Sequence, residues 1–164
     1  MEKVNKPNVG LCLDTFQTAG GEWADPTTRS GLIEHEGGRD ALEKQFHKSL
    51  EELSATIPQY KIFILQISDA YKPQTPLDQN PDSTGLRPRG RWSSCLRPVP
   101  FDGGYLPVND VAKAVLRTGF QGWFSMEVFD GGPHGNDRDW KDMSGYAKKA
   151  MQAHKRLLRE VAES

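Results

Sequence analysis

The sequence has little cysteine, no long apolar segment and no excess of either charge. Its 164 residues include two cysteines, Cys12 and Cys95, too few for a disulfide framework or a cysteine zinc site. We therefore expect two free thiols in a reducing compartment. The longest apolar runs, such as 62–67, fall far short of the ~20 residues of a membrane-spanning helix. The polar first residues are not typical of a signal peptide, so these absences predict a cytoplasmic protein.

The charges are balanced, because 21 Lys and Arg face 22 Asp and Glu, for a net charge of −1. Such a surface offers no broad attraction for the phosphates of nucleic acids or for anionic lipids. We therefore expect neither nucleic acid nor a membrane as a partner. The length suits one compact domain, since domains cluster near roughly 100–150 residues.

Three segments of the chain repeat one pattern, in which a short apolar run is followed by a Gly- and Pro-rich loop and then by a helical pattern. The apolar runs predict strands near 9–14, 62–67 and 123–129. Strands that alternate with helices are typical of an α/β fold with a parallel sheet. The continuous, β-branched run at 62–67 indicates a strand that is covered on both faces.

Apolar residues at helical spacing predict a helix after each strand. The clearest stripe, which ends at Pro58, consists of Leu42, Phe46, Leu50, Leu53 and Ile57. A shorter helix is expected from an N-cap at Asn109 or Asp110 to Gly119, and a last helix over 146–161. The segment after Asp14 and the long segment 68–107 lack this periodicity and are predicted to be loops.

Polar residues lie at or near the ends of the three predicted strands, namely Asp14, Gln66 and Glu127. Side chains alternate faces along a strand, so all three can share one face of the sheet. The carboxyl ends of parallel strands are where α/β proteins bind ligands. Two carboxylates and one amide oxygen suit Mg²⁺ or Mn²⁺ better than zinc or copper. We therefore expect a divalent metal at this edge.

Each of these residues also has a purely structural interpretation. Asp14 at a strand end is placed to cap the following turn, and a buried Gln66 can satisfy backbone groups. Glu127 lies in an apolar run, where a carboxylate is costly unless it binds a cation or pairs with an arginine.

Other polar residues are weaker candidates. Asp69 and Lys72 follow Gln66 closely, but residues of these types in loops are most often solvated. A basic and aromatic cluster is placed to hold one carboxylate or phosphate: it consists of Arg87, Arg89, Arg91, Trp92 and Arg97. His134 in a Gly-rich loop is expected to be merely exposed, and His47 and His154 in helical patterns are not expected to be catalytic.

Four stretches of the sequence carry a resemblance to one enzyme family. In order, they are LCLDTF at 11–16 with WADP at 23–26, LQISDA at 65–70, RWS at 91–93 with GGYLPV at 103–108, and GWFSMEVF at 122–129. They resemble fungal 3-dehydroshikimate dehydratases, which belong to the xylose isomerase-like TIM-barrel superfamily of sugar phosphate isomerases and epimerases. The resemblance implies an α/β fold in which residues 1–164 form a partial (β/α)8 barrel, about its last three βα units.

The resemblance also implies a set of site residues. Family members hold a divalent metal with Glu, Asp, His or Gln, and Glu from four successive strands. Asp14, Gln66 and Glu127 correspond to the last three, and the first has no counterpart. The implied substrate is a small molecule, either a polyhydroxylated cyclic carboxylate or a sugar. The implied substrate-binding residues are Gln17, Lys72, Trp92 and Arg97. Gln17 stands where some relatives carry His, and Ser94 stands where the dehydratases carry another Arg.

The implied activity is metal-dependent dehydration of 3-dehydroshikimate to protocatechuate, in quinate and shikimate catabolism, with the catalytic base outside this chain. Two alternatives stay open, namely isomerisation or epimerisation of a sugar or sugar phosphate, and a fragment without activity. Three strands of an eight-stranded barrel leave sheet edges exposed. We therefore expect a partner that covers them, either an N-terminal half-barrel or a second copy of the chain.

Overall fold

The structure is a computed structural model that describes residues 6–136 and 142–162. Its elements, in chain order, are β1 (Leu11–Asp14), α1 (Thr15–Glu22), α2 (Gly38–Thr56), the 3₁₀ turn η2 (Gln59–Lys61), β2 (Ile62–Ile67), α3 (Pro88–Cys95), β3 (Leu96–Arg97), α4 (Val108–Arg117), β4 (Trp123–Met126), β5 (Phe129–Asp130) and α5 (Met143–Ala162). Strands and helices alternate, as predicted for an α/β fold.

The predicted parallel sheet is confirmed, with strand order β1-β2-β4 and β2 in the centre. Its register sets Asp14, Gln66 and Ser125 side by side across the three strands. The sheet has three strands in the part of the chain that the structure describes, and it does not close into a barrel. Trp123 at the start of the edge strand β4 is 80% exposed.

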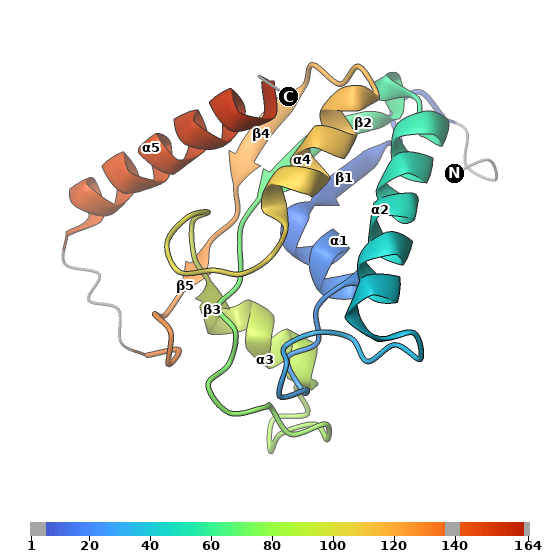
Figure 1. Ribbon diagram of the computed structural model, residues 1–164. Helices are drawn as coiled ribbons and strands as arrows, with labels where there is room; N and C mark the ends of the chain where they lie inside the picture. The colour runs from blue at the N-terminus through green and yellow to red at the C-terminus, as the bar shows by residue number, and fades with distance from the viewer. Residues whose placement is uncertain (1–5, 137–141, 163–164) are drawn as a thin grey trace.

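The predicted third strand, 123–129, is wrong in its second half. Strand β4 ends at Met126, so Glu127 lies just beyond the strand rather than within it. The Glu127 amide still donates to the Ile67 carbonyl at 3.1 Å. The chain then pairs in a new direction, because β5 runs antiparallel to β3 and Phe129 lies opposite Arg97. Figure 1 shows this small second sheet and α3 beyond the carboxyl ends of the parallel strands.

Helices α2, α4 and α5 pack side by side over one face of the sheet (Figure 1). Leu65 and Ile67 of β2 are fully buried beneath them. The predicted stripe of α2 is confirmed, since Leu42, Phe46 and Leu50 are buried in the core and its last two members are partly buried against it. The predicted last helix is α5, and no described helix is both long and apolar enough to cross a bilayer.

Three sequence predictions about local structure are wrong. The segment after Asp14 forms helix α1, and the predicted loop 68–107 contains α3 and β3. These helices have eight residues each and no marked apolar stripe, which is the signal on which the prediction depended. Helix α4 begins after Pro107 instead of at Asn109 or Asp110, because Pro107 occupies the N-cap position.

Trp92 gives α3 its attachment to the core. Its side chain is fully buried, its indole nitrogen donates to the Tyr71 carbonyl at 2.8 Å, and its ring packs 4.7 Å from the ring of Phe16. Without this one residue, a polar helix would have little reason to dock, since Trp92 is its only buried member.

We expect Trp92→Phe to lower the free energy of unfolding by about 2–3 kcal/mol, because it removes buried ring area and the indole hydrogen bond to the Tyr71 carbonyl. Urea titration followed by circular dichroism measures the change. The exposed Trp123→Phe is the matched control, with an expected change within about 0.5 kcal/mol. Equal losses in both variants would contradict this account.

Candidate functional site

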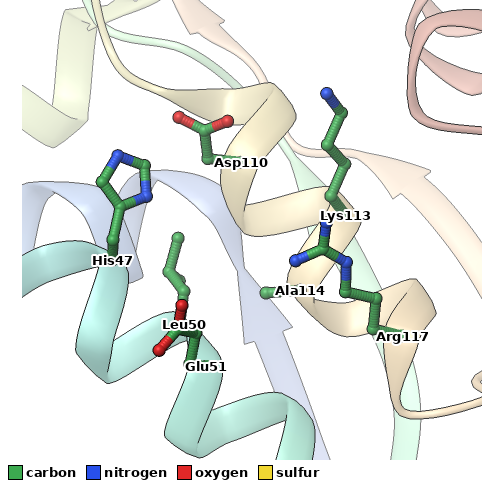
Figure 2. A pocket seen from close by; sticks show the side chains of 7 residues that line it. All are labelled: His47, Leu50, Glu51, Asp110, Lys113, Ala114 and Arg117. Atoms are coloured by element: carbon green, nitrogen blue, oxygen red, sulfur yellow. The ribbon is translucent and has the colours of Figure 1, made fainter. Parts of the chain in front are cut away.

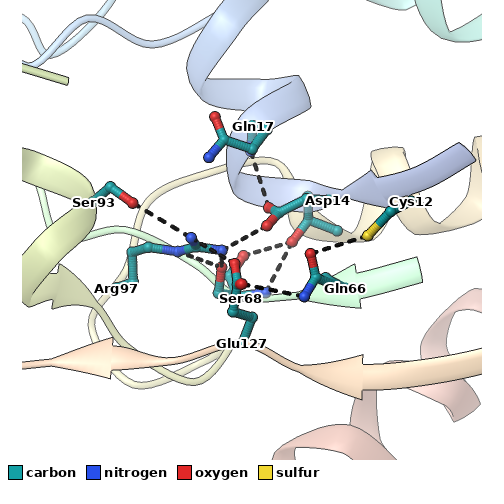
Figure 3. Close-up of polar contacts among 9 residues, drawn as sticks. Cys12, Asp14, Gln17, Gln66, Ser68, Ser93, Arg97 and Glu127 are labelled. Carbon is teal, nitrogen blue, oxygen red and sulfur yellow. Dashed lines mark hydrogen bonds and ion pairs between the residues drawn. The ribbon is translucent and has the colours of Figure 1, made fainter. Parts of the chain in front are cut away.

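The three residues predicted to share one edge of the sheet do lie together. Asp14 ends β1, Gln66 lies at the end of β2 and Glu127 follows β4, so all three stand at the carboxyl ends of parallel strands. Figure 3 shows their side chains in one connected polar network. The order of strands in the sheet, rather than closeness in the chain, brings them together.

The centre of this network is the guanidinium of Arg97. Its Nη2 lies 2.7 Å from Asp14 Oδ2, and its Nη1 lies 2.8 Å from Glu127 Oε2. Nε and Nη2 also donate to Ser68 Oγ, at 3.0 and 2.7 Å, and Nη1 reaches Ser93 Oγ at 3.4 Å. These contacts use every N–H group of the guanidinium. Arg97 is therefore a fully satisfied buried cation, 1% exposed.

Neighbouring elements hold Arg97 in this position. The guanidinium carbon lies 4.5 Å from the centre of the Phe16 ring and 5.4 Å from that of Phe129. Thr15 joins the ends of β1 and β2, because its hydroxyl donates to the Ser68 carbonyl at 2.6 Å and accepts from the Ser68 amide at 3.0 Å. Sequence reasoning missed Ser68, although a polar residue directly after a buried strand was a usable signal.

Both structural interpretations of the carboxylates are confirmed. Asp14 caps α1, since its Oδ1 accepts from the Gln17 amide at 3.0 Å, while its Oδ2 pairs with Arg97. Glu127 pairs with an arginine, namely Arg97. Burial raises the pKa of Asp14 above its ordinary value, and the guanidinium and the amide of Gln17 oppose this shift.

Gln66 connects Glu127 to a thiol. Its Nε2 donates to Glu127 Oε1 at 3.2 Å, and its Oε1 accepts from the Cys12 thiol at 3.2 Å. Partial burial and the charges of Asp14 and Glu127 raise the pKa of Cys12, which keeps this thiol a donor. Cys12 and Cys95 are both free, as predicted.

The donor types at this site fit a hard divalent ion. Two carboxylate oxygens from different strands already face one cation, and Ser125 Oγ, in register with Gln66, is buried without a hydrogen-bond partner among the described residues. The Gln66 amide now directs its nitrogen toward Glu127. It must turn by half a rotation before its oxygen can join the carboxylates as a metal ligand. The described residues contain no cluster of three or more His, Cys, Asp or Glu side chains placed to hold a metal. The cation that the carboxylates hold here is Arg97.

The other predicted substrate-binding residues lie at varied positions. Gln17 is exposed on α1, beside Asp14. Lys72 is also exposed, and its methylene groups lie near Gly31. Trp92 belongs to the core and lines no surface. Of the basic cluster, Arg91 donates to backbone carbonyls, including that of Asn80 at 3.0 Å.

Asp69 is buried, against the expectation that it is solvated. Its Oδ1 accepts from the amides of Ala70 at 2.7 Å and Leu106 at 2.8 Å, which fastens the 99–107 segment to the end of β2. Gly104 permits this approach, because a Cβ there would lie 2.1 Å from the Asp69 carboxyl carbon. Burial raises the pKa of Asp69 to about 6, although the backbone amides oppose the shift.

A separate cavity of about 240 Å³ lies between α2 and α4 (Figure 2). Its lining consists of His47, Leu50, Glu51, Asp110, Lys113, Ala114 and Arg117. It contains none of the residues at the strand ends. Its side chains carry charges of both signs, so it has no clear preference for one class of ligand.

The fold and the site together define a segment of an α/β barrel with a polar centre at the carboxyl ends of its strands. The model of the family described as "Xylose isomerase-like TIM barrel" matches residues 1–157. The chain therefore belongs to the xylose isomerase-like TIM barrel family.

The relatives show how much of a complete protein the chain covers. It is 34% identical over 139 residues to 3-dehydroshikimate dehydratase of Neurospora crassa, which confirms the resemblance in the sequence. This match covers 79% of the chain and 36% of that enzyme. The chain thus spans about a third of the length of this relative.

Two solved structures are similar to the chain. A xylose isomerase-like TIM barrel/4-hydroxyphenylpyruvate dioxygenase fusion protein has a TM-score of 0.62 and 21% identity, over 98% of this chain and 18% of that one. The IolI protein, solved with a bound zinc atom, has a TM-score of 0.47 and 21% identity, over 98% of this chain and 40% of that one. At these identities, the first likeness shows the fold alone, and the second is too distant to inform the site.

The Asp69 carboxyl predicts a pH dependence of stability. Its pKa of about 6 in the folded chain exceeds the ordinary 3.8, so the folded state binds the proton more tightly. The resulting stabilisation is complete below pH ~4 and is lost as the pH rises through ~6, a change of roughly 2–3 kcal/mol. Asp69→Asn keeps an acceptor oxygen but cannot ionise. It should therefore remove this contribution to the pH dependence of the free energy of unfolding.

The measurement is the free energy of unfolding from urea titrations between pH 4 and pH 7, on the wild type and on Asp69→Asn. Glu51→Gln, at an exposed position of α2, serves as the control and should keep the wild-type slope. A slope that Asp69→Asn leaves unchanged would show that this carboxyl does not titrate as described.

Proposed function

We propose that this chain is the C-terminal portion of a metal-dependent barrel lyase that dehydrates 3-dehydroshikimate to protocatechuate, a step of quinate and shikimate catabolism. The observation that carries the proposal is the convergence of Asp14 and Glu127, from different strands, on one cationic position. The 34% identity to a 3-dehydroshikimate dehydratase supports the choice of substrate.

Asp14, Gln66 and Glu127 are the proposed ligands of Mg²⁺ or Mn²⁺. Oxygen donors of this kind are what hard divalent ions prefer. When bound, the ion acts as a Lewis acid that polarises the ketone oxygen of the substrate. Because the chain spans 36% of its relative, we propose that the fourth ligand and the catalytic base come from outside it, from an N-terminal half-barrel or a second copy.

The remaining proposed roles concern the substrate. Gln17 and Lys72 are exposed and can donate hydrogen bonds to its hydroxyl and carboxylate oxygens. Arg97 is the proposed partner of the substrate carboxylate, for which its guanidinium must first release one of its own carboxylate partners. Trp92 is proposed to back the wall of the pocket, and its packing against Phe16, the residue that also stacks on Arg97, supports a positioning role.

Isomerisation or epimerisation of a sugar phosphate is the alternative reaction in this superfamily. Both reactions use a polarised carbonyl, so the ligand set does not separate them. The test incubates the chain, alone and mixed with the part of the Neurospora crassa relative that it does not cover, with 3-dehydroshikimate and with a panel of sugar phosphates in the presence of Mn²⁺. Formation of protocatechuate, seen by its ultraviolet absorbance, supports the proposal, and turnover of a sugar phosphate alone overturns it. Lack of both activity and Mn²⁺ binding favours a non-catalytic fragment.

Glu127→Gln tests the proposed ligand set. The change removes one of two negative charges at nearly constant volume, so we expect it to abolish Mn²⁺ binding as measured by calorimetry. Glu34→Gln, on an exposed loop, should bind Mn²⁺ like the wild type. Unchanged affinity in Glu127→Gln would refute this position for the metal.

A further inference from the structure

We infer that Arg97 and a divalent ion are alternative occupants of one position between Asp14 and Glu127, so that Arg97 sets the affinity of the site for metal. The inference rests on the proposed function, because it takes these two residues as metal ligands. It goes further by giving this chain an internal cation that competes with the metal. Arg97 is in this sense a positioning residue that acts through the two carboxylates.

The geometry makes joint occupancy of the same oxygens unfavourable. Nη2 and Nη1 of Arg97 lie 2.7 Å from Asp14 Oδ2 and 2.8 Å from Glu127 Oε2 (Figure 3). An Mg²⁺ ion shared by these oxygens would lie about 2.1 Å from each. This is the space that the N–H groups of the guanidinium fill. Since the guanidinium does not lose its proton in proteins, it must move for the ion to enter.

The charges determine what the exchange gains and what it costs. Two carboxylates and one guanidinium leave one negative charge in a cluster where Asp14 is 5% and Arg97 1% exposed, while the Glu127 side chain is 33% exposed. A divalent ion brings twice the charge of the guanidinium to the same two oxygens. The displaced guanidinium loses its carboxylate partners, and a buried charge without compensation is costly. Arg97 therefore lowers the affinity of the site for metal.

Contacts that do not involve the carboxylates oppose the movement of Arg97. Its Nε donates to Ser68 Oγ at 3.0 Å and its Nη1 reaches Ser93 Oγ at 3.4 Å. The Phe16 ring lies against the guanidinium carbon at 4.5 Å. These contacts hold the guanidinium against the two carboxylates, so they add to the cost of the exchange and lower the affinity of the site for metal.

The first test measures Mn²⁺ affinity by electron paramagnetic resonance for the wild type, Arg97→Gln and Arg97→Lys. We expect Arg97→Gln to bind Mn²⁺ at least roughly tenfold more tightly than the wild type, because the competing charge is gone. Arg97→Lys keeps the positive charge but loses the paired N–H groups of the guanidinium, so its Mn²⁺ affinity should lie between those of the wild type and Arg97→Gln. Arg91→Gln, whose parent side chain donates to backbone carbonyls, is the matched control with wild-type affinity.

A second test does not depend on the folding of Arg97→Gln. Ser68→Ala removes the hydroxyl that accepts from Nε and Nη2, which loosens Arg97 and should tighten Mn²⁺ binding several-fold. In the wild type, the NMR signal of the Arg97 Nε–H group, assigned by its loss in Arg97→Lys, should shift when Mg²⁺ is added. A purely structural role for Arg97 predicts weaker metal binding in each variant.

The outcomes separate the two proposals. If the wild type binds Mn²⁺ but Arg97→Gln and Ser68→Ala bind it equally or more weakly, the competition is overturned and the metal site stands. An Arg97 Nε–H signal that does not move while calorimetry records Mg²⁺ binding also overturns the competition. If neither the wild type nor the variants bind Mn²⁺, the proposed metal site fails and the competition fails with it.

Discussion

The ion pairs of Arg97 with Asp14 and Glu127 are the interaction on which the functional end of this chain depends. The two carboxylates stand at the ends of different strands, and one guanidinium joins them at 2.7 and 2.8 Å. Without a cation, bringing these carboxylates together away from water would cost several kcal/mol. The guanidinium therefore allows the polar ends of the strands to be packed rather than held apart in solvent.

The segment between β2 and α4 positions this guanidinium, because Arg97 is the last residue of β3. Trp92 anchors α3 in the core, and β3 follows directly, with Arg97 paired to Phe129 of β5. The same pairing turns the chain just after Glu127 and sets this carboxylate beside Arg97. The buried Asp69 carboxylate accepts from the Leu106 amide and so holds the segment between β3 and α4 against the end of β2. Packing and electrostatics are thus coupled: the core residue Trp92 and the buried Asp69 position a charge that neither contacts.

The regular part of the fold was predictable because it follows from periodicity. The apolar run at 62–67 became β2 with the same bounds, and the stripe of Leu42, Phe46 and Leu50 faces the core. Helix α1 escaped prediction because its eight residues carry no marked apolar stripe, although the Asp14 cap was a local signal for it. Helix α3 escaped because a single tryptophan docks it on the core. Strands β3 and β5 have two residues each, too short to leave any pattern.

The sequence by itself determined the parallel sheet, its covering helices and the three polar residues at the strand ends, because spacing and residue type are local properties. It also predicted that Glu127 needs a partner, since a carboxylate in an apolar run is costly alone. Only the tertiary structure decided that this partner is Arg97 and that Asp14 shares it. Arg97 is 83 residues from Asp14 along the chain, and its choice of neighbours follows from how α3, β3 and β5 fold back over the sheet. Spacing and residue type are local, so they do not predict an ion pair between residues that only the packing of distant segments brings together.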